Sequence, residues 1–391
     1  MLENDLKFLE ETFKQYYFDH FDSIHVPDRS QEREYGYKKF NSGMVRHISL
    51  KTDKDLHLML MTNVPSDVFC SNAYYTFPNL PMAEKDWKEA DLIFDIDAKD
   101  LNLSCRKDHP CVKCLSCGEV SLLHDTCPKC KSNKLDLLSL TCDNCISGVK
   151  KEVLNLIKIL TNDLQIDDKN VRTSFSGNEG FHLYVANSSY NQLGSKERGD
   201  LIDYIMFRRV MPERFGFKKE NPSRHTFPEL DEAGWRGRVA KELFGSKSKR
   251  SKAITKIISD GKLAYQQILE EIGKNSIGIK IDPNVTVDIH RIFRLEGSLN
   301  SKSGLAKLAC ENIERFDPYT ETCLIDDSSV EVSANFPIEF RLKNTKFKKN
   351  LEILKKSKIF EFFFEIFEIF EIFCFFFENI FRDDKKKKSL E

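Results

Sequence analysis

The chain has 391 residues, of which 60 are Lys or Arg and 61 are Asp or Glu, and 40% of all residues are apolar. This length allows one large domain or two to three smaller ones, and the composition excludes a chain too polar to form a core. The formal net charge of −1 leaves nucleic-acid binding open, because a local basic patch can lie within a neutral total.

The N-terminus and the cysteines both predict a reduced, intracellular protein. The first 17 residues have no basic start followed by an apolar run, so they do not predict a secretory signal. Eight of the twelve cysteines lie between Cys105 and Cys145, which is typical of metal-binding thiolates rather than of a disulfide framework.

Helices and strands are predicted to alternate along the chain without an internal repeat, which favours a mixed α/β or α+β fold. The predicted elements are a helix over 1–20, strands within 43–63, a short apolar strand at the end of 88–94, an amphipathic helix over 149–164, two strands around a glycine turn over 171–186, helices over 195–210 and 252–272, and a further strand within 281–300.

The segment LIFDIDA places Asp95 and Asp97 at the end of an apolar strand. Side chains two residues apart on a strand share a face, and paired carboxylates repel unless a cation lies between them. Such oxygen ligands suit Mg²⁺ or Mn²⁺ and a two-metal nucleotidyl-transfer site. An isolated pair is equally compatible with a solvated strand end. The candidates for a third carboxylate are Asp282, which is predicted to end a short apolar strand (IGIKID), and Asp288.

Two further groups of residues suit an anion such as a phosphate. Ser176 and Gly177 lie in a turn and His182 lies on the strand that follows, so backbone amides, a hydroxyl and an imidazole could donate to one anion. A second set downstream has the same chemistry and comprises Arg291, Arg294, Ser298 and Lys302. A hairpin with a core-facing histidine remains the alternative for the first set.

Residues 236–256 form a local basic run with eight Lys or Arg and one Glu. A run of this kind can bind a nucleic-acid backbone through counterion release, or can simply be a solvated loop. The C-terminal run 359–381 contains eleven Phe and five Glu, and these carboxylates argue against a membrane span. It predicts either a low-complexity tail without a specific function or an amphipathic helix that docks on a partner.

Within the cysteine-rich segment, two CxxC knuckles are separated by nine residues, and this spacing predicts a tetrahedral structural zinc site. Its ligands are Cys114, Cys117, Cys127 and Cys130. Closed four-ligand sites leave no open position, so catalytic zinc is not expected.

Taken in order, several segments resemble the small catalytic subunit of the archaeal and eukaryotic replicative DNA primase, and archaeal members most closely. The matching segments are EREYGY, AYYTF followed by KDWKEADLIFDIDA, SFSGNEGFHLYV, GWRGRVA and IDPNVTVDIHRIFRLEGSLNSKSGL. The resemblance runs from about residue 5 to about residue 345.

The resemblance implies a fold, an activity and partners. The fold would be a catalytic core with an RRM-like sheet over 1–104 and 146–345, a zinc-binding insertion over 105–145, and an atypical tail over 346–391. The activity would be template-directed synthesis of short RNA primers from nucleoside triphosphates on single-stranded DNA. The partner would be the primase large subunit, with the replicative polymerase machinery as a possible contact, no membrane, and a cytoplasmic location in an archaeal cell or a nuclear one in a eukaryote.

The resemblance also assigns residues. Asp95, Asp97 and Asp282 would hold two Mg²⁺ or Mn²⁺ ions, with Asp288 secondary, and both phosphate-binding sets would hold the triphosphate. The family's own zinc site implies Cys105, His109, Cys142 and Cys145 as ligands, with Cys111 as an alternative to the histidine, so that two zinc sites would be nested.

Three residues depart from the family pattern: Glu179 stands where Arg is frequent, Glu296 where Pro is expected, and Asn300 where His is usual. Glu179 would repel a triphosphate unless it points away or pairs with a neighbour such as Arg172. Two other functions remain open: a primase-polymerase of the same superfamily acting in repair or on a mobile element, and a non-catalytic zinc-ribbon subunit that binds nucleic acid.

Overall fold

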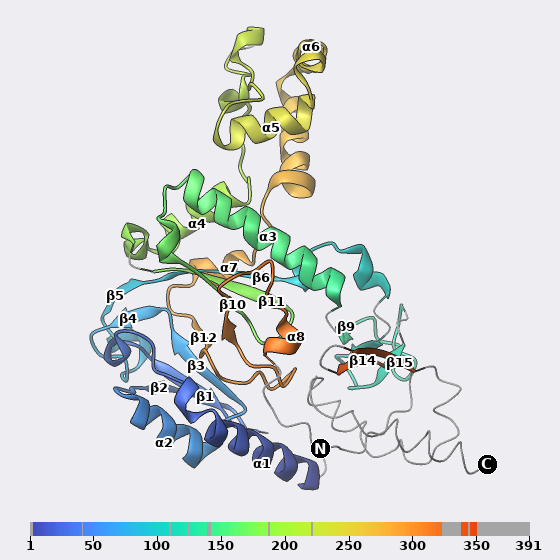
Figure 1. The fold of residues 1–391 in the computed structure, drawn as a ribbon. Helices are drawn as coiled ribbons and strands as arrows, with labels where there is room; N and C mark the ends of the chain where they lie inside the picture. Colours follow the sequence, from blue (N-terminus) through green and yellow to red (C-terminus); the bar gives the residue numbers. More distant parts are fainter. Residues whose placement is uncertain are drawn as a thin grey trace, which may run out of the picture.

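The computed structural model describes residues 3–40, 42–108, 111–122, 125–138, 142–186, 188–219, 222–322, 338–342 and 345–349. These residues form a mixed α/β structure around antiparallel sheets (Figure 1), as the sequence predicts. His109 and the run 359–381 lie outside the described residues, so the structure does not bear on their predicted roles.

One four-stranded sheet has the order β12-β3-β1-β2, and every neighbouring pair in it is antiparallel. Its strands are β1 (Tyr35–Lys38), β2 (Met44–Ile48), β3 (Asp67–Ser71) and β12 (Ile292–Arg294). Helices α1 (Glu3–Asp19) and α2 (Asp53–Asn63) lie beside this sheet (Figure 1). The predicted N-terminal helix is confirmed, and it buries Leu9, Phe13, Tyr16 and Tyr17, which recur at helical spacing.

The prediction of strands within 43–63 is confirmed for Met44–Ile48, which forms β2, but it is wrong for Asp53–Asn63, which forms the helix α2. Thr52 and Asp55 form a capping box, in which the Thr52 hydroxyl accepts from the Asp55 amide and the Asp55 carboxylate accepts from the Thr52 amide. This arrangement satisfies amides that the first helical turn leaves free. Leu56, Met59 and Leu60 are buried, which is a helical spacing rather than the alternation of a strand.

The second four-stranded sheet has the order β13-β10-β11-β6. Its strands are β6 (Leu92–Asp97), β10 (Val171–Phe175), β11 (Gly180–Val185) and β13 (Leu308–Ala309), so the predicted strand before Asp95 and the predicted pair around the glycine turn are confirmed. Helix α3 (Asp143–Asn162) crosses this sheet (Figure 1). Phe94, Ile96, Phe181 and Leu183 are fully buried in the same core as the apolar stripe of α3, which leaves the opposite face of the sheet for polar side chains.

Three smaller sheets complete the strands. They are β4 (Ala73–Tyr75) with β5 (Trp87–Ala90), the three-stranded β7 (Cys111–Cys114), β8 (Val120–Leu122) and β9 (Leu135–Leu138), and the hairpin of β14 (Ile338–Leu342) with β15 (Thr345–Lys349). The cysteine-rich segment therefore folds as a small sheet of its own between β6 and α3.

The remaining helices are α4 (Ser195–Ile205), α5 (Gly234–Phe244), α6 (Lys247–Ile272), α7 (Pro283–Val287) and α8 (Pro318–Glu321). Helices α5 and α6 project away from the sheets as an arm (Figure 1). Gly261, at φ 86°, interrupts α6, because this left-handed conformation suits glycine. None of the helices in the described ranges is both long and apolar enough to cross a membrane.

Candidate active site and cysteine centres

The pairing of β6 with β11 places the two carboxylates of LIFDIDA beside the predicted histidine. Asp95 is opposite His182, and Asp97 is opposite Gly180. A Cβ at position 180 would lie 2.1 Å from an Asp97 carboxylate oxygen and 2.5 Å from the Ile96 carbonyl oxygen. Only glycine therefore leaves room for the Asp97 carboxylate against β11.

Asp282 is brought to the same place, although it does not end a strand as we expected. It is the N-cap of α7, and its carboxylate accepts from the Asn284 amide at 3.0 Å. The Asp282 amide donates to the Asp95 carbonyl oxygen at 3.1 Å, and the Thr286 hydroxyl donates to the Ile93 carbonyl oxygen at 2.6 Å. These two bonds hold the start of α7 against β6.

The carboxylates of Asp95, Asp97 and Asp282 lie close enough to interact electrostatically, and one oxygen of Asp95 lacks a hydrogen-bond partner. Burial raises the pKa of Asp95 to about 8, and the neighbouring Asp97 and Asp282 act in the same direction. One Asp95 carboxylate oxygen is buried and has no hydrogen-bond partner, although the His182 ring nitrogen lies 3.4 Å away. Buried carboxylates without a counter-charge are costly, so the donor set fits a divalent cation.

Lys99 is a member of the site that sequence reasoning missed. Its ammonium lies 2.5 Å from an Asp97 carboxylate oxygen, two residues further along the chain. Within the described residues, the oxygen atoms of the three carboxylates do not all lie within 4.8 Å of one another. Asp288 is exposed and its carboxylate accepts from the His290 amide at 3.0 Å, so the structure favours Asp282 over Asp288 as the third carboxylate.

The Ser176–Gly177 turn packs against the loop that carries the second predicted phosphate set. Gly177 has φ 86°, and a Cβ there would lie 3.1 Å from Asn300 Cβ. The Ser303 hydroxyl donates to the Gly177 carbonyl oxygen. The two predicted phosphate-binding segments, which are separated by about 110 residues in the sequence, therefore lie side by side in the fold.

His182 is 9% exposed, and it joins the carboxylates to a buried polar chain. Burial lowers the pKa of His182 well below its usual value, and the nearby cations Lys307 and Arg294 act in the same direction. Its Nδ1 lies 3.3 Å from the Tyr184 hydroxyl, which also contacts the Lys307 ammonium. Sequence reasoning missed Tyr184 and Lys307, because both look like ordinary strand residues.

In the second predicted phosphate-binding set, the side chains of Arg291 and Lys302 are not tied to other described residues of the loop in the way that those of Arg294 and Ser298 are. Arg291 lies close enough to lower the pKa of Asp95, and the Lys302 side chain is exposed. Arg294 pairs with Asp67 at 2.7 Å and donates to the Leu299 carbonyl oxygen at 2.6 Å. Ser298 is fully buried, and its hydroxyl donates to the Leu295 carbonyl oxygen. This bond stabilises the conformation of the loop after β12.

Glu179 is paired, but not with Arg172 as we suggested. Its carboxylate accepts from Arg106 at 2.7 Å, and Arg106 belongs to the cysteine-rich segment. Burial raises the pKa of Glu179, and the Arg106 hydrogen bond opposes this shift. The cysteine-rich segment thus neutralises an acidic side chain in the turn beside the carboxylate site.

The basic run 236–256 lies on α5 and the start of α6, in the projecting arm. Three of its arginines are used within the fold: Arg236 pairs with Glu232, Arg238 with Asp163, and Arg250 with Glu229. The five lysines of the run are exposed. Binding of a polyanion there stays a prediction, and it would depend on these lysines.

The cysteine-rich segment contains two thiol clusters. The sulfur atoms of Cys114, Cys117, Cys127 and Cys130 lie within 4.8 Å of one another, in agreement with the predicted knuckles. Those of Cys105, Cys142 and Cys145 form a second cluster of the same tightness. Thiolate donors in this arrangement fit zinc. The structure does not describe His109 or the Cys111 side chain, so the fourth ligand of the second cluster stays a prediction.

Comparison with known proteins gives one consistent result. The family model described as DNA primase small subunit matches residues 135–309. The DNA primase small subunit PriS of Nitrosopumilus maritimus is 60% identical over 347 residues, covering 89% of this chain and 93% of that protein. The PriS of Cenarchaeum symbiosum is 51% identical with the same coverage.

The polymerase domain of Mycobacterium tuberculosis Ligase D in complex with DNA is a distant structural neighbour, with a TM-score of 0.36 and 9% identity over 77% of this chain and 80% of that chain. This likeness is too weak to bear on the fold. The sequence relatives decide the family: the chain belongs to the DNA primase small-subunit family.

Proposed function

We propose that the chain synthesises short RNA primers on a single-stranded DNA template, by nucleotidyl transfer at the Asp95, Asp97 and Asp282 site. The observation that carries the proposal is the buried Asp95 carboxylate oxygen without a hydrogen-bond partner, beside two further carboxylates. Family membership supports a nucleotidyltransferase rather than the non-catalytic alternative.

The three carboxylates would hold two Mg²⁺ or Mn²⁺ ions. Such ions supply Lewis-acid stabilisation of the charge that develops on the reacting oxygens during phosphoryl transfer. Lys99 holds the Asp97 carboxylate through an ion pair of 2.5 Å, and a cation bound to Asp97 would take its place.

The protein's own donors would bind and orient the triphosphate. The backbone at Gly177 packs against the loop that carries Asn300. The neighbouring Ser176 would contribute its hydroxyl, and Arg291 and Lys302 would add positive charge. His182 is held neutral by burial and can donate one hydrogen bond without adding charge. Arg294 is fixed by Asp67, so it enters the reaction in a defined position.

The finer domain assignments are part of this proposal. Residues 1–104 and 146–345 would form the RRM-like catalytic core of the family, residues 105–145 a zinc-binding insertion, and residues 346–391 a separate tail. The primase large subunit would be the partner chain. The position of Arg106 against Glu179 supports an insertion that contributes to the active site as well as to folding.

The test is a primer-synthesis assay with labelled ribonucleotides on single-stranded DNA, with the large subunit present. Changing Asp95→Asn together with Asp97→Asn should lower the rate about a thousandfold or more, since charge stabilisation in the transition state is lost. Asp288→Asn is the matched control, because this exposed carboxylate lies outside the group, and its rate should be unchanged. A double variant that keeps the wild-type rate would contradict the proposal, and a preference for deoxyribonucleotides would favour the primase-polymerase alternative.

A further inference from the structure

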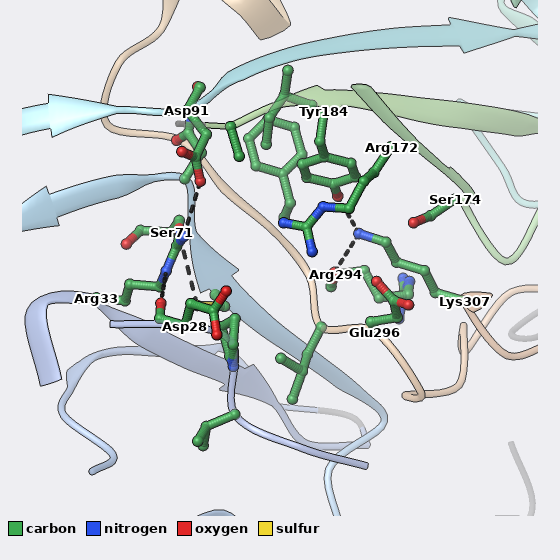
Figure 2. A pocket seen from close by; sticks show the side chains of 18 of the residues that line it. Asp28, Arg33, Ser71, Asp91, Arg172, Ser174, Tyr184, Arg294, Glu296 and Lys307 are labelled. Atoms are coloured by element: carbon green, nitrogen blue, oxygen red, sulfur yellow. Dashed lines mark hydrogen bonds and ion pairs between the residues drawn. The ribbon is translucent and has the colours of Figure 1, made fainter. Parts of the chain in front are cut away.

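A cavity of about 370 Å³ lies between the two four-stranded sheets, toward the Asp91 end of β6 (Figure 2). Its wall includes Ile93 and Tyr184, but none of the three metal-site carboxylates and not His182. Cavities of this size take small-molecule ligands, and those with a few convergent polar groups are the best candidates. The cavity therefore adjoins the proposed catalytic cleft without including its carboxylates, and Tyr184 and Arg294 lie at the boundary between the two.

Most of the charged side chains in the cavity wall already have partners. Arg33 pairs with Asp91 at 2.9 Å and Arg294 with Asp67 at 2.7 Å. Arg29 pairs with Glu32 and Glu89 and lies over the Tyr74 ring. These groups hold the wall in place and leave little capacity for a ligand.

Lys307 is different, because it is a buried cation without an ion pair. It is 2% exposed, and its ammonium contacts the Tyr184 hydroxyl and the Arg294 carbonyl oxygen, the latter at 2.7 Å. No carboxylate of the described residues lies within 4.0 Å of it, although Glu296 in the wall is near enough to favour its charged form. Burial lowers the pKa of Lys307 to about 7, as expected for an ammonium short of negative partners.

Two further donors face the cavity from β10. Arg172 and Ser174 are two residues apart on that strand and so lie on the same face of the sheet as Tyr184. Neither side chain has a hydrogen bond or ion pair with another described residue. Figure 2 places both beside Lys307 at one side of the cavity. A guanidinium, a hydroxyl and an ammonium that converge in this way match the oxygens of a phosphate group.

The rest of the wall suits the body of a larger ligand. The rings of Tyr184, Phe293 and Tyr74 supply flat apolar surface, while the carboxylates of Glu296 and Asp28 can accept hydrogen bonds from hydroxyl or amino groups. We propose that this cavity binds a phosphate monoester of nucleotide size, with its phosphate held by Lys307, Arg172 and Ser174, at a site distinct from the catalytic cleft.

Calorimetric titration of the full, zinc-loaded chain with AMP, in a buffer without added Mg²⁺ or Mn²⁺, tests the proposal. Arg172→Gln and Lys307→Met should each weaken AMP binding at least tenfold. Arg172 is exposed, so its variant should fold normally, and a Lys307 variant that failed to fold would leave the test with Arg172→Gln. Arg209→Gln, at an arginine whose side chain is 81% exposed outside the cavity, is the matched control and should keep the wild-type affinity.

Two further measurements distinguish AMP binding in this cavity from binding in the proposed catalytic site and from binding of any small anion. Arg291→Gln, in the proposed catalytic cleft, should leave AMP binding at the cavity intact, so the result does not depend on whether primer synthesis occurs there. AMP should bind at least tenfold more tightly than inorganic phosphate. The proposal is overturned if wild-type protein binds no AMP at millimolar concentration, if Arg291→Gln but not Arg172→Gln abolishes binding, or if inorganic phosphate binds as tightly as AMP.

Discussion

Two acidic residues four positions apart, Asp91 and Asp95, each have a buried carboxylate oxygen, but the surroundings of these oxygens are opposite. The Asp91 carboxylate accepts from Arg33 at 2.9 Å, from Tyr74 at 3.0 Å and from Asn191 at 3.0 Å. Asp95 has two carboxylates as neighbours and a buried oxygen with no hydrogen-bond partner. Asp91 therefore joins neighbouring segments of the fold through satisfied hydrogen bonds, whereas the surroundings of Asp95 agree with its proposed role as a ligand of a divalent cation.

The largest effect that separates the two sites is expected at Arg33. Arg33→Met should lower the free energy of unfolding by about 3–5 kcal/mol, because it leaves the Asp91 carboxylate buried without a counter-charge. Asp95→Asn replaces a carboxyl group whose charged form is disfavoured by burial and by the neighbouring Asp97 and Asp282, so it should leave the stability unchanged or raise it. Urea denaturation of both variants measures this contrast, and equal destabilisation by the two would mean that the sites do not differ.

Lys307 extends the comparison to a buried cation. The folded-state pKa of Lys307 is lowered to about 7, whereas the unfolded value is close to 10.4. The unfolded chain therefore binds this proton more tightly, and its contribution to stability rises with pH between these two values. From pH 7 to pH 9, wild-type protein should gain about 2 kcal/mol relative to Lys307→Met, measured by urea denaturation at each pH. A constant difference would show that the lysine keeps its proton throughout this pH range in the folded protein, as it does in the unfolded chain.

A smaller effect is expected at the ion pair of Glu179 with Arg106, in which Arg106 neutralises the negative charge that Glu179 brings to the turn after β10. Arg106→Gln would free the Glu179 carboxylate beside the proposed triphosphate site, so KM for the nucleotide should rise about threefold while kcat changes little. The double variant Arg106→Gln with Glu179→Gln should restore the wild-type KM, because the repulsive charge is then absent. An unrestored KM would assign the effect to the fold of the cysteine-rich segment.

What could be predicted from the sequence were the features that rest on local pattern. The apolar run before Asp95, the strands around Gly177 and the paired CxxC knuckles each have a spacing that fixes their geometry. The helix at Asp53–Asn63 was also within reach, since Thr52 and Asp55 are a capping-box signal that the alternating apolar pattern concealed.

The rest depended on long-range contacts that no local pattern encodes. Arg106 meets Glu179 across 73 residues, and Lys307 meets Tyr184 across 123. Asp282 reaches Asp95 through the docking of a five-residue helix rather than through the strand that its apolar neighbours suggested. Whether a charged residue is paired, unpaired or buried is decided by this tertiary packing, and that is why Tyr184 and Lys307 were missed.

Direct measurement of Mn²⁺ binding to the zinc-loaded chain tests the central claim, that the Asp95 site is built for a divalent cation. Electron paramagnetic resonance titration should show Mn²⁺ binding to wild-type protein and a loss of at least tenfold in affinity for Asp95→Asn with Asp97→Asn. Asp288→Asn should bind as wild type. A double variant that binds Mn²⁺ with the wild-type affinity and stoichiometry would contradict the claim.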